Sequence, residues 1–159
     1  MKVLSYNLFA PLLGNIKNWY SHIDRIKKIG FEWVYINPIT YPGFSGSLYA
    51  TKDYYKYNPA FFTSSEKDIA EKEIKDFVLY CKNNNIKIMI DLVINHSSKD
   101  CNLVEEHFEW YKLKDGKLES PGAWDNGKWI EWGDLASFNN QKIILNKDNE
   151  EIENPIWNY

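Results

Sequence analysis

Apolar residues in the first hundred positions alternate between short continuous runs and longer stretches with helical spacing. Residues 3–9, 31–37 and 86–98 contain short, nearly continuous apolar runs, which are typical of strands buried on both faces in a parallel sheet. Between these runs, residues 16–26 and 70–81 carry apolar side chains three or four positions apart, the spacing of amphipathic helices. Strands and helices that alternate through short links predict parallel βα units. The expected fold class is therefore α/β.

Capping residues support both predicted helices. Asn15 stands at the N-cap position of the first helix, and Gly30 follows it as a C-terminal stop. Ser64 and Ser65 precede the second helix, and acidic residues follow in its first turn. Residues 1–96 are therefore expected to run strand, helix, strand, loop, helix, strand.

The loop expected at residues 39–63 separates the second strand from the second helix. At about 25 residues it is longer than most loops of compact domains, and loops of this length are usually functional. It contains eight aromatic residues, including Tyr49, and Asp53 follows four positions later. Two interpretations stay open, a loop that lines a binding site and an Ω-loop packed by its own aromatic rings.

Polar side chains interrupt and close the third apolar run. Asp91 lies within it, and Asn95 and His96 follow at its end. A polar group in a buried strand is costly unless it has partners, and the carboxyl ends of parallel strands are where an α/β barrel builds its active site. The three residues are candidates for a functional site. The alternative is that Asp91 satisfies neighbouring backbone donors and that His96 sits in a loop.

After Ser98 the pattern changes. Residues 99–140 are polar, rich in glycine and aromatic residues, and show no strong period, so irregular structure is expected there. Trp124, Trp129 and Trp132 either line a sugar cleft or fill a small core.

Composition narrows the class of partner. The 159 residues carry a net charge of −3 with mixed signs, which favours neither nucleic acid nor an anionic membrane. Two cysteines make no disulfide framework, and no apolar run reaches the length of about 18 residues that a membrane span needs. The N-terminus is a poor signal peptide, so a soluble, cytoplasmic protein with reduced thiols is expected. Aromatic residues make up 16% of the chain, a proportion that suits either core filling or stacking on sugar rings.

Two segments resemble the α-amylase superfamily of glycoside hydrolases and transglycosylases. Asp91, Asn95 and His96 fall on the fixed positions of its first signature region, which implies that Asp91 and His96 approach the sugar at subsite −1 and that Asn95 helps to bind calcium. Tyr49 and Asp53 fall on the positions of a stacking tyrosine and of the aspartate four residues later. The surrounding SGSLYATKDYYKYNP is most similar to intracellular maltosyltransferase-like members.

The resemblance implies a domain organisation. Residues 1–98 correspond to the N-terminal part of a (β/α)8 TIM barrel, about its first three strands, and residues 99–140 to the irregular domain B inserted after the third strand. Residues 141–159, with a proline suited to a helix N-terminus, correspond to the truncated start of the third barrel helix. Asp134, in a segment that resembles the end of domain B, falls on a calcium-binding position, but the next acidic position of that pattern is Ala136. The calcium ligand set of Asn95 and Asp134 is therefore incomplete.

The catalytic carboxylates of the family are not expected in this chain. A full barrel needs about 250 residues, and a retaining glycosidase needs a nucleophile and an acid from later strands. The family's nucleophile motif has an arginine two residues before the aspartate, whereas the single arginine, Arg25, is followed by Ile26 and Lys27. The chain alone is predicted to be inactive.

Three functional hypotheses follow. The first is a fragment of a retaining glycoside hydrolase or glucanotransferase that acts on α-1,4-glucans such as starch, glycogen or maltooligosaccharides. The second is a non-catalytic protein of the same ancestry that binds sugars or another chain. The third is an unrelated α/β domain. An incomplete sheet leaves an unpaired apolar edge, so self-association, or association with the remainder of a barrel, is also expected.

Overall fold

The computed structural model describes residues 4–145, 148 and 150–158, and the chain divides into two compact units. The first unit contains Met1–Tyr41 and Tyr54–Leu92, and the second contains Pro42–Asp53 and Val93–Tyr159. The division therefore falls a few residues before Ser98, the predicted end of the barrel part. The assignment of the second unit to a domain B stays a prediction.

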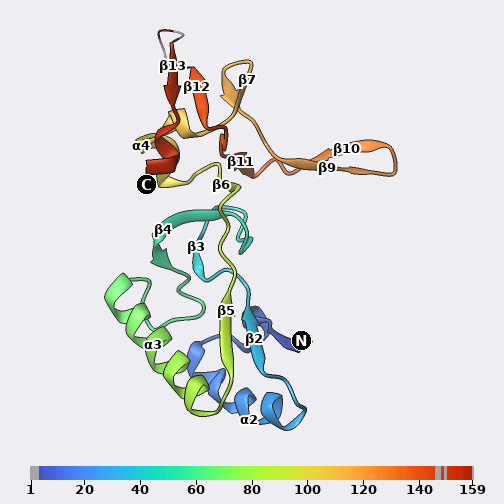
Figure 1. Cartoon of the computed structure of the whole chain (residues 1–159), viewed down its shortest axis with the longest axis vertical. Coiled ribbons are helices and arrows are strands. Elements are labelled where there is room, and N and C mark those ends of the chain that lie inside the picture. Colours follow the sequence, from blue (N-terminus) through green and yellow to red (C-terminus); the bar gives the residue numbers. More distant parts are fainter. Residues whose placement is uncertain (1–3, 146–147, 149, 159) are drawn as a thin grey trace. The chain divides into compact units, whose positions relative to one another are not determined.

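The first unit is built on a parallel sheet in the order β1-β2-β5 (Figure 1). Its strands are β1 (Ser5–Leu8), β2 (Trp33–Ile36) and β5 (Lys87–Ile90). Its helices are α1 (Ala10–Leu13), the 3₁₀ helix η1 (Ile16–Asn18), α2 (Tyr20–Lys28) and α3 (Lys67–Asn83). Helices separate the parallel strands along the chain, as predicted, and the α/β class is confirmed. Val3, where the first strand was expected to begin, lies outside the described residues.

The apolar stripe of the first predicted helix forms the core of this unit. Ile16, Ile23 and Ile26 are buried, and Trp19 packs edge-on against Phe77 with ring centroids 5.6 Å apart. The helix is divided into η1 and α2, and the Asn15 side chain caps η1 by accepting a hydrogen bond from the Lys17 backbone N–H.

The strand expected at residues 86–98 is two strands in two different sheets. β5 ends at Ile90, and β6 (His96–Ser98) pairs antiparallel with β11 (Leu135–Ser137) in the second unit. β5 is also not buried on both faces, because Met89 is 41% exposed and Ile90 is 38% exposed. The continuous apolar run therefore predicted a strand correctly, but the predicted length and the predicted burial of that strand were wrong.

The predicted loop at residues 39–63 contains secondary structure of its own. β3 (Thr40–Pro42) and β4 (Thr51–Tyr57) form a two-stranded sheet, and the connection between them carries Tyr49.

The second unit consists mostly of short antiparallel pairs, so the expectation of irregular structure at residues 99–140 was wrong. Two hairpins turn on Asp115-Gly116 and Asn126-Gly127, in which all four residues have positive φ, as type I′ turns require. Besides β6 and β11 the unit contains α4 (Asn102–Glu106), the 3₁₀ helix η2 (Phe108–Trp110), β7 (Leu113–Lys114), β8 (Lys117–Leu118), β9 (Gly122–Asp125), β10 (Lys128–Glu131), β12 (Ile143–Leu145), β13 (Glu151–Glu153) and the 3₁₀ helix η3 (Pro155–Asn158).

Residues 141–159 were expected to begin the third barrel helix, but the structure has the β12–β13 pair there, followed by the short η3. That η3 begins a barrel helix stays a prediction, and Tyr159 lies outside the described residues. Among the described residues, no helix combines the length and the apolar character that a bilayer crossing requires.

Candidate functional site

Asp91 directly follows β5 in the first unit. Its backbone N–H donates to the Ile36 carbonyl at 2.9 Å, which continues the ladder between β5 and β2. Its carboxylate Oδ2 accepts a short hydrogen bond from the Tyr35 hydroxyl on β2. The structure thus gives the Asp91 carboxylate a tyrosine hydroxyl as its partner, in place of the neighbouring backbone donors of the alternative interpretation. This bond holds a half-buried carboxylate at the end of the strand while engaging only one of its two oxygens.

His96 opens β6 in the second unit and is held at both ring nitrogens. Asn95 Nδ2 lies 2.8 Å from Nδ1, and the Tyr49 carbonyl oxygen lies 3.0 Å from Nε2. Since the Asn95 amide N–H donates to Nδ1, the ring proton belongs on Nε2, which donates to Tyr49. The ring is buried, and burial lowers the pKa of His96 below its usual 6.5 although the Tyr49 bond and the Asp134 charge act to raise it. His96 is thus a neutral imidazole with a defined tautomer at pH 7.

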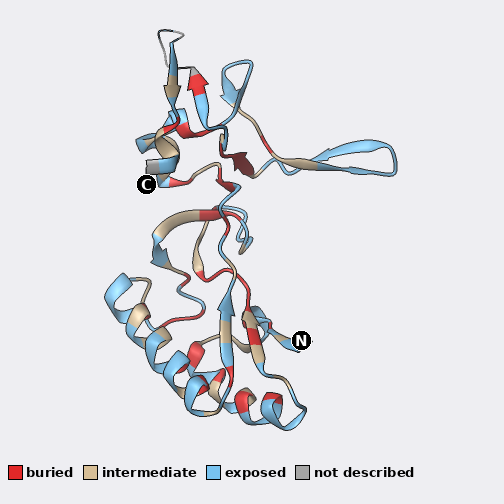
Figure 2. Ribbon diagram, viewed as in Figure 1, coloured by how far each residue is buried: buried red, intermediate tan, exposed pale blue. Residues whose placement is uncertain are grey.

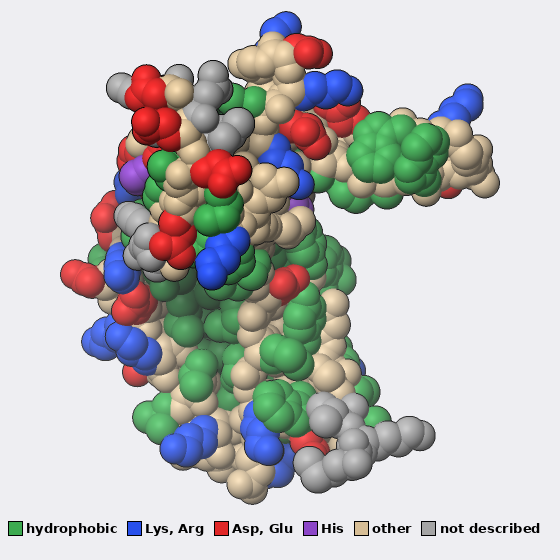
Figure 3. Space-filling view, turned by 45° about the horizontal axis from the view of Figure 1, so that its top comes forward, with side chains coloured by type: hydrophobic (Ala, Val, Ile, Leu, Met, Phe, Trp, Pro, Cys, Tyr) green, Lys and Arg blue, Asp and Glu red, His purple; other side chains and the backbone are tan. Residues whose placement is uncertain are grey.

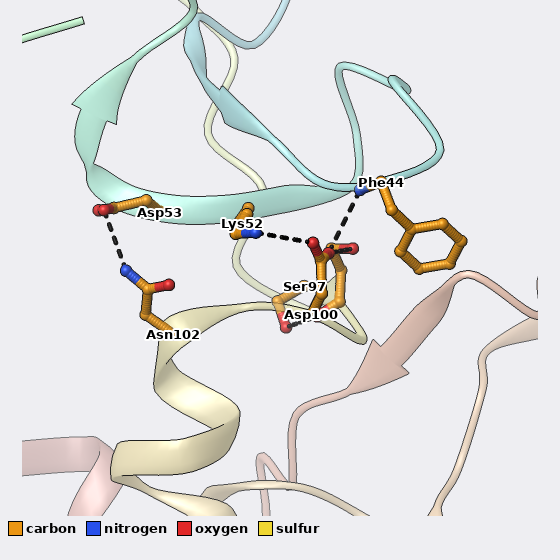
Figure 4. A network of polar contacts seen from close by, with 7 residues as sticks. Phe44, Lys52, Asp53, Ser97, Asp100 and Asn102 are labelled. Carbon is orange, nitrogen blue, oxygen red and sulfur yellow. Dashed lines mark hydrogen bonds and ion pairs between the residues drawn. The ribbon is translucent and has the colours of Figure 1, made fainter.

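The loop that carries Tyr49 is fastened to the segment after β6 by a network that centres on Asp100 (Figure 4). The Asp100 carboxylate accepts hydrogen bonds from the Ser98 hydroxyl and from the Phe44 backbone N–H, and Lys52 Nζ lies 3.1 Å from it. Partial burial acts to raise the pKa of Asp100, but these donors outweigh it and the pKa is lowered. Sequence reasoning missed Asp100, because a single acidic residue after the signature region has no periodicity to mark it.

Asp53 makes a separate contact in the same figure. It accepts a hydrogen bond of 3.0 Å from the Asn102 side-chain amide at the start of α4 (Figure 4). The Tyr49 side chain is 41% exposed, so its ring is accessible to a ligand. That Asp53 orients Tyr49 stays a prediction, while its contact with Asn102 adds a second fastening between β4 and α4.

The proposed calcium ligands do not form a complete set. Asn95 uses its amide nitrogen toward His96, and Asp134 lies near enough for its charge to act on that ring. Calcium takes about six to eight oxygen ligands, and the part of the chain that the structure describes has no group of three or more His, Cys, Asp or Glu side chains able to hold a metal. Asn95 and Asp134 alone do not fit the ion, and their assignment to calcium stays a prediction.

The candidate residues fall into two groups. Tyr49, Asn95 and His96 are in mutual contact through His96 in the second unit, whereas Asp91 is bonded to Tyr35 in the first. Trp124, Trp129 and Trp132 do not fill a small core, since they are 73%, 49% and 46% exposed.

Comparisons with known proteins identify the family. The chain is 24% identical to an oligo-1,6-glucosidase of Bacillus cereus over 91% of its own length and 28% of that protein, and 30% identical to maltase A2 of Drosophila melanogaster over 92% and 27%. The crystal structure of an α-amylase from Lactobacillus plantarum is similar with a TM-score of 0.68 and 26% identity, over 86% of this chain and 31% of that one.

These neighbours are glycoside hydrolases of the α-amylase barrel type. A family model described as the glucanotransferase domain of glycogen debranching enzyme matches residues 3–114. The chain belongs to the α-amylase family of glycoside hydrolases. It spans between 27% and 31% of the length of the oligo-1,6-glucosidase, the maltase and the α-amylase named above.

Proposed function

We propose that this chain is the N-terminal part of the catalytic domain of a retaining glycoside hydrolase or glucanotransferase that acts on α-1,4-linked glucans. In this proposal β1, β2 and β5 are about the first three strands of a (β/α)8 barrel, and the second unit contains its domain B. The two free cysteines are buried and unpaired, which supports a reducing, cytoplasmic location.

The observation that carries the proposal is the bond between His96 and Tyr49. The two residues belong to two separate segments that match the family, 47 residues apart, and the His96 ring donates to the Tyr49 backbone at 3.0 Å. A histidine from the signature region therefore fixes the backbone of the residue expected to stack on the sugar. Accidental matches in an unrelated domain give no reason for such a contact.

In this proposal, which carries the roles over from the family's signature positions, Tyr49, Asp91 and His96 each contribute to binding the sugar at subsite −1. The exposed Tyr49 ring stacks on the apolar face of the sugar, and the Asp91 carboxylate accepts hydrogen bonds from its hydroxyl groups. His96, with its proton on Nε2, holds the Tyr49 backbone, and a sugar hydroxyl reaches that proton only by displacing the Tyr49 carbonyl. The nucleophile and the general acid, which must lie about 5–5.5 Å apart in a retaining enzyme, come from segments outside this sequence.

The test is to express the chain together with the sequence that follows it in the genome. We expect release of reducing sugar or glucan transfer on maltoheptaose. His96→Gln should lower kcat/KM by about 100-fold, the scale of a 1 Å misplacement of a group at the site. His22→Gln is the matched control, because His22 lies on α2. An extended protein with no carboxylate in the nucleophile position and no activity would refute the proposal.

A non-catalytic sugar-binding protein of the same ancestry is the second candidate. This candidate predicts that the extended protein binds maltooligosaccharides without converting them, which calorimetry and an activity assay on the same sample distinguish.

A further inference from the structure

The hairpin β9–β10 carries an exposed tryptophan pair that the proposed subsite does not use. Trp124 and Trp129 are direct cross-strand partners, so their side chains lie on the same face of the hairpin. Their rings meet edge-on with centroids 5.8 Å apart, and they are 73% and 49% exposed. The hairpin is exposed along nearly all of its length (Figure 2). Large aromatic side chains left in water on a short ribbon call for an occupant.

Trp129 packs over Gly122 on the neighbouring strand. A Cβ atom at Gly122 would come within 2.8 Å of Trp129 Cε2 and Cζ2 and within 2.4 Å of the Ile130 carbonyl oxygen. A side chain there would therefore clash with both the ring and the backbone of β10. The glycine leaves room for the indole to lie against the hairpin.

A hollow of about 790 Å³ lies beside Trp129 within the second unit. Its charged lining is balanced, with three lysines and three carboxylates, contributed by Lys99, Lys114, Lys117, Asp115, Glu119 and Glu131. Ser120 also lines it, and the Ser120 hydroxyl is buried without a hydrogen-bond partner among the described residues. Figure 3 shows hydrophobic side chains gathered on the arm that extends to the right, which is the hairpin β9–β10.

The lining selects the chemistry of the ligand. Equal numbers of cations and carboxylates disfavour an anion such as nucleic acid, which requires a net positive surface. The same groups supply many donors and acceptors for a neutral ligand with several hydroxyl groups, and the aromatic wall accommodates its apolar face. Such a ligand is an oligosaccharide. The unpaired Ser120 hydroxyl gives a further polar group at the same place.

We propose that an α-glucan segment binds in this hollow and stacks on Trp129, with Trp124 extending the aromatic surface. The choice of an α-glucan rests on the proposed function, whereas the oligosaccharide site rests on the hairpin itself. The site is additional to Tyr49, Asp91 and His96 and would hold a polymeric substrate on the second unit.

Native affinity electrophoresis of the full chain in gels with and without glycogen tests the proposal. The wild-type chain should be retarded by glycogen, and Trp129→Ala should weaken the apparent affinity about tenfold, which corresponds to about 1.4 kcal/mol. Ile130→Ala, on the other face of the same strand, is the matched control and should be retarded like the wild type. Trp124→Ala provides a second variant, because its ring is so exposed that folding does not depend on it.

The outcomes separate this site from the proposed subsite. Asp91→Asn alters the proposed subsite and leaves the hairpin intact, so the part of the retardation that depends on Trp129 should remain in this variant. If Asp91→Asn abolishes retardation while Trp129→Ala and Trp124→Ala keep it, glycogen binds at the subsite and the hairpin proposal is overturned. Absence of retardation in the wild-type chain overturns it as well, without bearing on the activity of the extended protein. Equal retardation by a soluble β-glucan would support an oligosaccharide site but refute its selectivity for α-glucans.

Discussion

Replacing Gly43 by alanine should loosen the loop that carries Tyr49. Gly43 follows β3, and its N–H donates to the Ala50 carbonyl at 2.7 Å. An added Cβ would lie 2.0 Å from Ser98 Oγ and 2.5 Å from Asp100 Oδ1. Both neighbours are constrained, because Ser98 donates to Asp100 and Asp100 pairs with Lys52. The methyl group therefore cannot be accommodated by a simple rotation of a free side chain.

These contacts set the free-energy cost of the Gly43→Ala substitution. Overpacking a constrained site costs about 1–3 kcal/mol. The Lys52–Asp100 pair is 42% and 31% exposed, so losing it adds at most about 1 kcal/mol after solvent screening. A local destabilisation of about 2 kcal/mol corresponds to an opening equilibrium about 30-fold more favourable.

Amide hydrogen exchange followed by mass spectrometry measures this opening directly. We expect exchange in a peptide covering residues 42–53 to accelerate about 10- to 100-fold, while peptides from β1 and α2 keep wild-type rates. Gly133→Ala is the matched control, because nothing lies within 4 Å of its added Cβ. Unchanged exchange at residues 42–53 in the Gly43 variant, or an equal change in the Gly133 variant, would refute the reasoning.

Three further results are expected. Burial lowers the pKa of His96 in the folded state, so its stabilising contribution is complete above about pH 6.5, the usual pKa. This contribution is lost as the pH falls through the lowered pKa of the folded state. The urea midpoint should therefore drop between about pH 7 and 5, and less so in His96→Gln. Tyr35→Phe removes the hydroxyl that binds Asp91 and should lower kcat/KM of the extended protein about tenfold, the scale of a hydrogen bond to a charged group, whereas unchanged kinetics would exclude a positioning role. Burial raises the pKa of Cys81 to about 12 and also raises that of Cys101, so iodoacetamide at pH 8 should alkylate both only after urea is added; rapid labelling of the native chain would contradict their burial.

The helical parts of the first unit could be predicted from the sequence because their signals are local. The stripe from Ile16 to Ile26 became the buried face of η1 and α2, and Asn15 capped the first turn as its side chain allows. In α3 the apolar stripe of residues 70–81 is only partly buried, since Ala70 and Phe77 are buried but Val78 is 37% exposed. Periodicity locates the buried stripe, whereas the width of that stripe depends on what covers it.

The hairpins of the second unit were predictable but were not predicted. Asp115-Gly116 and Asn126-Gly127 are the residue pairs that type I′ turns favour, and they stand between segments that pair as β7–β8 and β9–β10. Hydrophobic periodicity does not mark these strands, because β9 and β10 are mostly exposed on both faces.

The site itself could be located only in part, because the signature residues mark positions and not contacts. Asp91, His96 and Tyr49 were all singled out, but their partners are set by pairings distant in sequence. Tyr35 meets Asp91 across 56 residues, and no local pattern announces that a tyrosine hydroxyl will replace a backbone donor. Asp100 meets the Phe44 backbone across the same separation.

The unexpected exposure of β5 bears on the proposed function. β5 pairs with β2 on one side, and its other edge has no partner strand among the described residues. Met89 and Ile90, which point to opposite faces of the sheet, are both exposed. The apolar run nevertheless has the composition of a strand covered on both faces, and a sequence of that kind gains nothing from a solvent-exposed edge. In a complete barrel a further strand would pair with this edge, and the other strands and helices would cover both faces, which would leave Asp91 at the open end of the strand. The mismatch between apolar composition and exposure thus supports the proposal that β5 is an inner strand of a larger sheet.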